Sequence, residues 1–375
     1  MNIALASIHA RSLSIPFKAA FSHASADRSV TQTLWVQAGD SAGLTGYGEG
    51  CPREYVTAET IGGALDFVAR HRTLWIAGIH DLPSLKAWVN AHRREIDIEP
   101  AAWSAVELAL LDLLGKRGDC SVEALLGLPT IDGSFRYTAV IGDGSPARFE
   151  AELERYRLAG FDDFKIKLSG DPARDAGKVA ALRRAGIDPA RVRADANNLW
   201  PGAEVAIAAL RALAFPFGAV EEPIRANDVD GLAAIAKATG CGVILDESLL
   251  RADQLDAFAR HPARWLVNLR ISKMGGLLRS LELVERIGAL GFGVVVGAHV
   301  GETSLLTRAA LTIAHAARDI VVASEGAFGT HLLAHDIVDP PIMFGAGGVL
   351  NAASLPRRAG GFGLGNIDPA LLASP

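Results

Sequence analysis

Cysteine is scarce in this chain, and its three cysteines lie far apart in the sequence. Cys51, Cys120 and Cys241 form no CxxC pair, so neither a disulfide framework nor a zinc site is indicated. We interpret them as thiols of a reducing compartment. No apolar run approaches the roughly 18 residues that a membrane-spanning helix needs, and residues 1–16 lack the apolar stretch of a signal peptide. The chain is therefore expected to be soluble and cytoplasmic.

An excess of basic residues is also missing. Lys and Arg number 37 against 42 Asp and Glu, and no basic cluster is interleaved with aromatic residues. Nucleic-acid binders use a basic field, so neither nucleic acid nor a membrane is expected as a partner. The 375 residues, 50% of them hydrophobic, are enough for two domains, one of them a barrel of about 200–250 residues.

The first part of the chain has the pattern of an α+β domain. Apolar and polar residues alternate over Ile3–Ile15, Thr31–Gln37 and Leu44–Glu49, which predicts strands. Helices follow, the clearest at Ala101–Lys116, where the large apolar residues fall on one stripe. We therefore expect an α+β domain over residues 1–130.

Short apolar strands then alternate with amphipathic helices over residues 131–344, with a repeat of roughly 25 residues. Eight such repeats favour a parallel (β/α) barrel over the alternative, an open doubly wound sheet. A dinucleotide-binding sheet of that kind would carry a GxGxxG after its first strand, and this sequence has none there. The tail, residues 345–375, is expected to pack back on the first domain. The predicted barrel strands are Phe135–Ile141, Asp163–Leu168, Val192–Ala196, Ala219–Glu222, Val243–Asp246, Trp265–Leu269, Val294–Gly297 and Ile320–Ala323.

Polar residues gather where the predicted strands end. The second strand carries Lys165 and Lys167 on one face, because side chains alternate along a strand. The next three strands end at Asp195, Glu221 and Asp246. Taken singly, these residues could be helix caps, turn residues or exposed strand ends. The carboxyl ends of barrel strands form the active-site mouth, so together they predict one polar site.

Three carboxylates held close together repel one another unless a cation lies between them. An all-oxygen donor set suits Mg²⁺, or alternatively Mn²⁺. Such an ion would stabilise the enediolate that forms when the proton next to a substrate carboxylate leaves. A lysine beside the ion and a second ammonium has a lowered pKa and can accept that proton. The prediction is a metal-dependent enzyme acting on a small carboxylate.

With these motifs the sequence resembles the enolase superfamily, in particular its muconate-lactonizing-enzyme subgroup. The K-x-K of strand two and the D-x-N, E-x-P and D-E-S settings of the three carboxylates carry the resemblance. It implies an N-terminal capping domain over a (β/α)7β TIM-like barrel, and often a homo-oligomer. It also implies Lys167 as the acid/base, Lys165 as its modulator, and Asp195, Glu221 and Asp246 as the metal ligands.

Two positions depart from the family pattern. Strand six usually offers a second acid/base lysine two residues after an asparagine, and this chain has Arg270 there. Arginine stays protonated, so it can orient or polarise a substrate, or pair with Asp246, but it accepts protons poorly. Lys273 lies three residues further on. Strand seven is followed by His299 in place of a methionine, with Glu302 one residue late; His299 can be a substrate contact, a second proton carrier or a structural histidine.

We therefore expect a one-base cycloisomerase or dehydratase-type lyase. The alternative is a racemase or epimerase of an amino-acid derivative or dipeptide, with His299 or Lys273 as the opposing base. A non-catalytic barrel that binds a metal and a ligand is a third possibility, against which the complete set of carboxylates and lysines argues. Glu325 could hold a cationic group of the substrate, and two loops of the capping domain carry His23 and Tyr55. The expected substrate contacts are Asn197, Lys273, His299, Glu302, Glu325, His23 and Tyr55.

Overall fold

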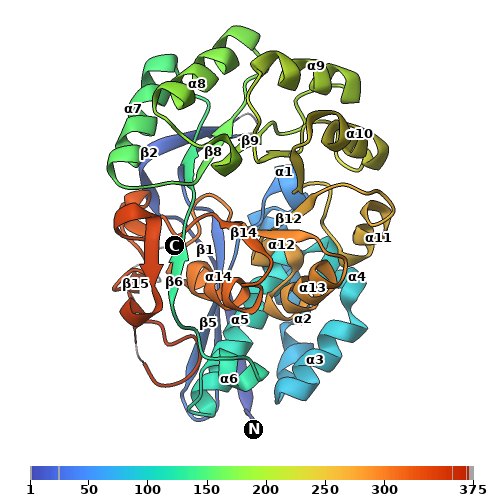
Figure 1. The fold of residues 1–375 in the computed structure, drawn as a ribbon. Coiled ribbons are helices and arrows are strands. Elements are labelled where there is room, and N and C mark those ends of the chain that lie inside the picture. Colours follow the sequence, from blue (N-terminus) through green and yellow to red (C-terminus); the bar gives the residue numbers. More distant parts are fainter. Residues whose placement is uncertain (1, 24–25, 357, 369, 371–375) are drawn as a thin grey trace.

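An antiparallel sheet and a group of helices form the N-terminal part of the chain (Figure 1). The computed structural model describes residues 2–23, 26–356, 358–368 and 370, without the side chains of 19–28. The sheet has the strand order β1-β4-β5 and confirms the predicted strands, whereas the antiparallel pair of β2 and β3 was missed because apolar and polar residues alternate only weakly there. The elements are β1 (Leu5–Leu13), β2 (Pro16–His23), β3 (Ala26–Val30), β4 (Thr33–Asp40), β5 (Thr45–Gly50), α1 (Glu54–Thr57), α2 (Ile61–Gly78), α3 (Leu82–Ala91), α4 (Arg93–Ile98), α5 (Pro100–Arg117) and α6 (Val122–Leu126).

Eight parallel strands form the second part of the chain, each hydrogen-bonded to the next in sequence order. A backbone hydrogen bond of 2.8 Å from Thr138 N to Ser324 O joins the first strand to the last. Helices follow seven of the strands, which confirms the (β/α)7β barrel with its α+β cap; Figure 1 shows α7 to α10 at the top and α3 and α6 of the N-terminal part at the bottom. The elements are β7 (Ala139–Ile141), α7 (Pro146–Leu158), β8 (Phe164–Lys167), α8 (Pro172–Arg184), β9 (Val192–Asp195), α9 (Ala203–Leu213), β10 (Ala219–Glu221), α10 (Val229–Thr239), β11 (Gly242–Leu245), α11 (Leu255–Phe258), β12 (Trp265–Leu269), α12 (Ile271–Met274), α13 (Leu277–Ala289), β13 (Gly293–Val296), α14 (Ser304–Ala316) and β14 (Val321–Ser324).

The C-terminal segment returns to the outside of the barrel and to the cap. Strand β16 (Val349–Asn351) pairs with β6 (Ser134–Arg136), and Phe362 N donates to Asp112 of α5. The predicted strand Phe135–Ile141 is therefore wrong in part, since β6 leaves the barrel and only β7 belongs to it. The predicted domain boundaries stay predictions. Among the helices of the described residues, none combines the length and apolarity that crossing a membrane requires.

Helix α5 lies between the capping sheet and the barrel, where it packs on β5, β4 and α12. The predicted helix Ala101–Lys116 is confirmed, and its residues are buried on every face from Pro100 to Gly115, which the single apolar stripe did not indicate. Strand β5 approaches it closely because its inner face consists of glycines. A Cβ atom on Gly48 would stand 1.8 Å from the carbonyl oxygen of Ala105.

Replacing Gly48 by alanine should therefore separate β5 from α5 and destabilise the fold by about 3 kcal/mol or more. Chemical denaturation measures this loss. Gly177 of α8 is the matched control, since a Cβ there meets nothing within 4 Å. Because alanine is the better helix former, Gly177→Ala should stabilise by about 0.5–1 kcal/mol. Equal stabilities for the two variants would contradict the close packing.

Buried carboxylates cap helices at the boundary between the cap and the barrel. Glu59 accepts hydrogen bonds from the N–H groups of Ala101 and Ala102 at the start of α5, while Glu107 accepts from Leu278 N at the start of α13. Burial raises the pKa of Glu59 to about 8 and that of Glu107 to about 7. Both groups therefore bind a proton more tightly in the folded chain than in the unfolded one.

Glu59→Gln should flatten the dependence of stability on pH. The pKa of Glu59 in the folded chain, about 8, exceeds the ordinary value of 4.5. The stability that protonated Glu59 contributes is therefore complete below pH 4.5 and is lost as the pH rises through about 8. In that window the wild type should lose up to roughly 1.4 kcal/mol per pH unit relative to the variant, which does not titrate there. Urea unfolding across the window measures the difference, and parallel curves for the two proteins would refute it.

Candidate active site

The carboxyl ends of the barrel strands open into a cavity of about 260 Å³. The structure brings most of the predicted site residues to its wall. Glu221 lies just behind the wall and is almost fully buried, and the side chain of His23 lies outside the described residues. The predicted residues that line the cavity are Tyr55, Lys165, Lys167, Asp195, Asn197, Asp246, Arg270, His299, Glu302 and Glu325.

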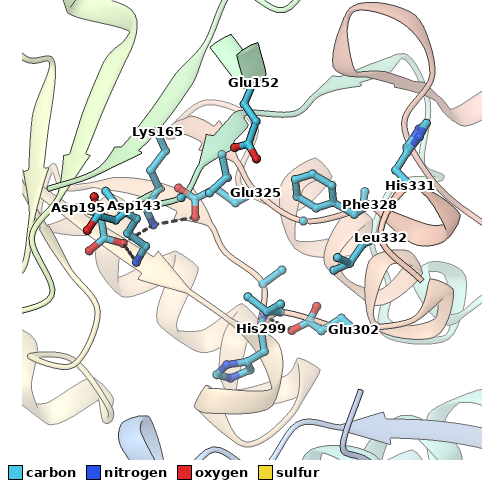
Figure 2. Close-up of a pocket in the computed structure, with 18 of the residues that line it drawn as sticks. Asp143, Glu152, Lys165, Asp195, His299, Glu302, Glu325, Phe328, His331 and Leu332 are labelled. Carbon is cyan, nitrogen blue, oxygen red and sulfur yellow. Dashed lines mark hydrogen bonds and ion pairs between the residues drawn. The ribbon is translucent and has the colours of Figure 1, made fainter. Parts of the chain in front are cut away.

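Lys165 is the deeper of the two lysines on β8. Its Nζ lies 2.6 Å from Glu221 Oε2, 3.0 Å from Glu325 Oε2 and 3.2 Å from Asp195 Oδ2, and Figure 2 shows it between Asp195 and Glu325. Burial lowers the pKa of Lys165, but the three negative charges outweigh burial and hold this pKa well above its usual value. Lys165 is therefore a fixed cation among carboxylates.

Lys167 stands nearer to the mouth, because it follows Lys165 by two positions on the same face of β8. Its side chain is 13% exposed, against 4% for Lys165. Its Nζ lies 2.5 Å from Asp195 Oδ2 and 2.7 Å from Asn197 Oδ1. Of this lysine pair, Lys167 is thus the one with open access to a molecule in the cavity.

The three predicted metal ligands lie on adjacent strands. Asp195 and Glu221 are direct neighbours in the register of β9 and β10, and Asp246 immediately follows β11. Basic side chains hold them here, and in the described part of the chain no three acidic, histidine or cysteine groups converge in a metal-binding arrangement. Burial and the charge of Asp195 raise the pKa of Glu221 to about 7. The donors nevertheless fit a hard divalent cation, because they are all oxygens and repel one another without added positive charge.

Two further residues orient these ligands, and both were missed from the sequence. Glu222 accepts hydrogen bonds of 2.7 Å from the backbone N–H groups of Asp246 and Ser248. Asn268 donates its Nδ2 to Glu221 Oε1 at 2.9 Å. Glu222 was missed because it directly follows Glu221 at the end of a strand, where the sequence does not show which of the two side chains points into the barrel.

Arg270 lies on the wall opposite Lys167, since β12 and β8 are four strands apart in a barrel of eight. Arg270 forms an ion pair with Asp246, which is one of the roles that the sequence predicted for it. Its NH1 lies 3.3 Å from His299 Nδ1. Burial lowers the pKa of Arg270, but the negative charges of Asp246 and Glu221 raise it by a larger amount, so the net shift is upward. The guanidinium therefore stays charged.

Lys273 does not reach the cavity in the described structure. Its side chain is 0% exposed, and Nζ donates to Asp246 O and Oδ1, both at 2.9 Å, and to Asn268 O at 2.8 Å. Lys273 is therefore not among the residues that line the cavity, because the short helix α12 turns this side chain back beneath the strand ends. The contacts make Lys273 a support for Asp246.

One wall of the cavity was not predicted at all. Figure 2 shows Glu152 facing the side of Glu325, with Phe328, His331 and Leu332 beyond them. Nothing in the amphipathic pattern of α7 distinguishes a helix face that lines a site from an ordinary solvated face. The lining residues missed from the sequence include Lys18, Asp143, Arg148, Glu152, Arg155, Glu247, Phe328, His331 and Leu332.

Comparison with known families matches both parts of the chain. Residues 3–127 match the model of the mandelate racemase / muconate lactonizing enzyme N-terminal domain, and residues 148–365 match the enolase C-terminal domain-like model. The hydrophobic dipeptide epimerase of Enterococcus faecalis is 26% identical over 329 residues, which cover 86% of this chain and 90% of that one. Muconate cycloisomerase 1 of Pseudomonas putida is 31% identical over 251 residues, which cover 64% of each.

Solved structures give the same fold. The dipeptide epimerase of Enterococcus faecalis V583, complexed with Mg and the dipeptide L-Leu-L-Tyr, superposes with a TM-score of 0.84 at 24% identity and covers 97% of this chain and 100% of that one. The muconate lactonizing enzyme of Pseudomonas fluorescens, complexed with muconolactone, also has a TM-score of 0.84 at 24% identity, with coverages of 99% and 98%.

Proposed function

Because the chain belongs to the mandelate racemase and muconate lactonizing enzyme group of the enolase superfamily, we propose that it removes the α-proton of a small carboxylate substrate. One observation carries the proposal. Lys167 lines one wall of the cavity, and Arg270, a cation that does not give up its proton, lines the opposite wall. This arrangement provides a proton acceptor on one face of a bound substrate and positive charge on the other.

The cofactor that we propose is Mg²⁺, or alternatively Mn²⁺, held by Asp195, Glu221 and Asp246. The chemistry of the three donors supports it, as does the relative whose structure was solved with Mg. When bound, the ion supplies positive charge against the negative charge that develops on the substrate carboxylate. Lys165 remains a cation beside the proposed ligands.

Lys167 would accept the α-proton from one face of the substrate. Arg270 would polarise or orient the other face without taking a proton. The carbanion then expels a leaving group from the neighbouring carbon, which completes an elimination or opens a lactone ring, or it recovers the proton on the face it left. A cycloisomerase runs the ring opening in reverse: ring closure onto a double bond places the electron pair on the α-carbon, and Lys167 would donate the proton to it. The function proposed first is therefore a one-base cycloisomerase or dehydratase-type lyase.

Exchange of α-protons in deuterated solvent with Mg²⁺ tests this function before the substrate is known. The panel contains muconates, acid sugars, hydroxyprolines and dipeptides, each followed by proton NMR. We expect α-deuteration or turnover of at least one compound, and its loss on chelation of the metal. Reaction that continues unchanged under chelation would overturn the metal-dependent mechanism.

Epimerisation is the second candidate, and the known relatives favour it. Besides the dipeptide epimerase, they include an N-succinyl-L-Arg/Lys racemase of Bacillus cereus, 25% identical over 83% of this chain. This function needs a proton carrier on the wall of Arg270. His299 lines that wall, whereas Lys273 is turned away from it in the described structure. Interconversion of dipeptide diastereomers by the wild type would favour epimerisation. Strict retention of configuration at the α-carbon would exclude epimerisation for the compounds tested.

A further inference from the structure

Arg270 and His299 form a buried pair beside the cavity. Arg270 NH1 lies 3.3 Å from His299 Nδ1, and His299 is only 3% exposed. Both residues line the cavity. Figure 2 shows His299 beside Glu302, on a different side of the picture from Lys165 and Asp195.

The contact with Arg270 determines which ring nitrogen of His299 carries a proton. A guanidinium has only N–H donors and no acceptor, so the nitrogen that faces it must accept. Nδ1 is therefore unprotonated, and the proton of the neutral ring is on Nε2. Burial and the charges of Arg270 and Arg53 lower the pKa of His299 well below its usual value, which agrees with a neutral ring.

Nε2 of His299 is buried and has no hydrogen-bond partner among the described residues. The backbone on either side of the ring is held by hydrogen bonds. His299 N donates to Glu302 Oε1 at 2.6 Å, and the buried Arg53 donates to Val300 O at 3.0 Å. Buried N–H groups are normally paired, and because His299 lines the cavity, a molecule bound there is a partner that would complete this one.

We infer that Arg270 fixes His299 as a neutral Nε2–H donor, and that this N–H binds an oxygen atom of the substrate. In this state His299 is not a base, since Arg270 engages the lone pair of Nδ1 and Nε2 already carries a proton. The inference rests on the proposed function and narrows its substrate. The carboxylate should carry a second oxygen acceptor, such as a hydroxyl, an amide carbonyl or another carboxylate, on the side away from Lys167.

Two substitutions separate a donor from a base in kinetics. His299→Gln places an amide N–H close to the position of Nε2, whereas His299→Asn places it close to Nδ1. We expect His299→Gln to keep kcat/KM within about tenfold of the wild type, and His299→Asn to lose about 10–100-fold, mainly through KM. His80→Gln, on the exposed surface of the cap, is the control and should change neither constant. Equal losses of kcat in both His299 variants would instead indicate a base and overturn the inference.

Nitrogen-15 NMR of the substrate-free protein tests the tautomer without any activity. With a histidine-labelled wild type and His299→Gln for assignment, we expect a protonated Nε2 and an unprotonated Nδ1 at neutral pH. Arg270→Met should remove this preference. A protonated Nδ1 in the wild type would overturn the inference whatever reaction is found. Failure of α-proton exchange would count against the proposed function but would leave the measured tautomer standing.

Discussion

Replacement of Lys167 by methionine is expected to reduce α-proton exchange and turnover by about 10³-fold or more. Methionine has a similar length but cannot accept a proton, and general acid–base groups contribute about 10²–10⁴-fold to rates. The side chain lines the cavity, and its Nζ lies 2.5 Å from Asp195 Oδ2. Exchange in deuterated solvent with saturating Mg²⁺ measures the loss.

Metal titration must accompany the Lys167 variant. Removal of a positive charge beside Asp195 should leave Mg²⁺ binding unchanged or tighter. Lys237→Met, on the exposed end of α10, is the matched control and should retain full activity. A Lys167→Met enzyme that keeps a substantial part of its exchange rate would show that another group takes the proton.

Glu221→Gln is expected to weaken metal binding by about 100-fold or more. Loss of a residue that only orients a ligand typically costs about 10–100-fold in affinity, and Glu221 is proposed as a ligand itself. Calorimetric titration with Mg²⁺, and with Mn²⁺ as a second probe, measures the change. Exchange of the substrate α-proton should fall in parallel.

The metal-free form distinguishes this effect from unfolding. Because burial and nearby carboxylates raise the pKa of Glu221 to about 7, the neutral glutamine should not lower the thermal stability of the metal-free protein at a pH below that value, where Glu221 itself is mostly neutral. Glu204→Gln, on the exposed surface of α9, is the control and should bind metal as the wild type does. Unchanged affinity in Glu221→Gln would contradict its assignment as a ligand.

The barrel was predictable from the sequence because its strands are buried on both faces and form short apolar runs. The predicted strand Trp265–Leu269 agrees with β12 at both ends. The prediction of Phe135–Ile141 as one strand was wrong because β6 pairs with β16, more than two hundred residues away. Such a pairing leaves no local pattern. The same is true of α5, whose second buried face is covered by elements distant in the sequence.

The centre of the site was predictable for a related reason. Parallel strands end at one level, so Lys167, Asp195 and Asp246 had to lie close together, although their roles stay predictions. The outer wall was not predictable, since residues such as Glu152 reach the cavity only through the position of a whole helix. Lys273 was also misplaced, because the turn of α12 decides its direction.

The configuration of the α-carbon after partial exchange tests the one-base account most directly. A single enantiomer of the substrate identified by the panel, or of its chiral product where the substrate has no stereocentre, is incubated with enzyme and Mg²⁺ in deuterated solvent, and chiral separation with mass spectrometry follows. With Lys167 on one wall and Arg270 on the other, we predict deuterium only in recovered starting enantiomer and in forward product. Early appearance of the opposite enantiomer, fully deuterated at the α-carbon, would contradict the account and establish a second proton carrier.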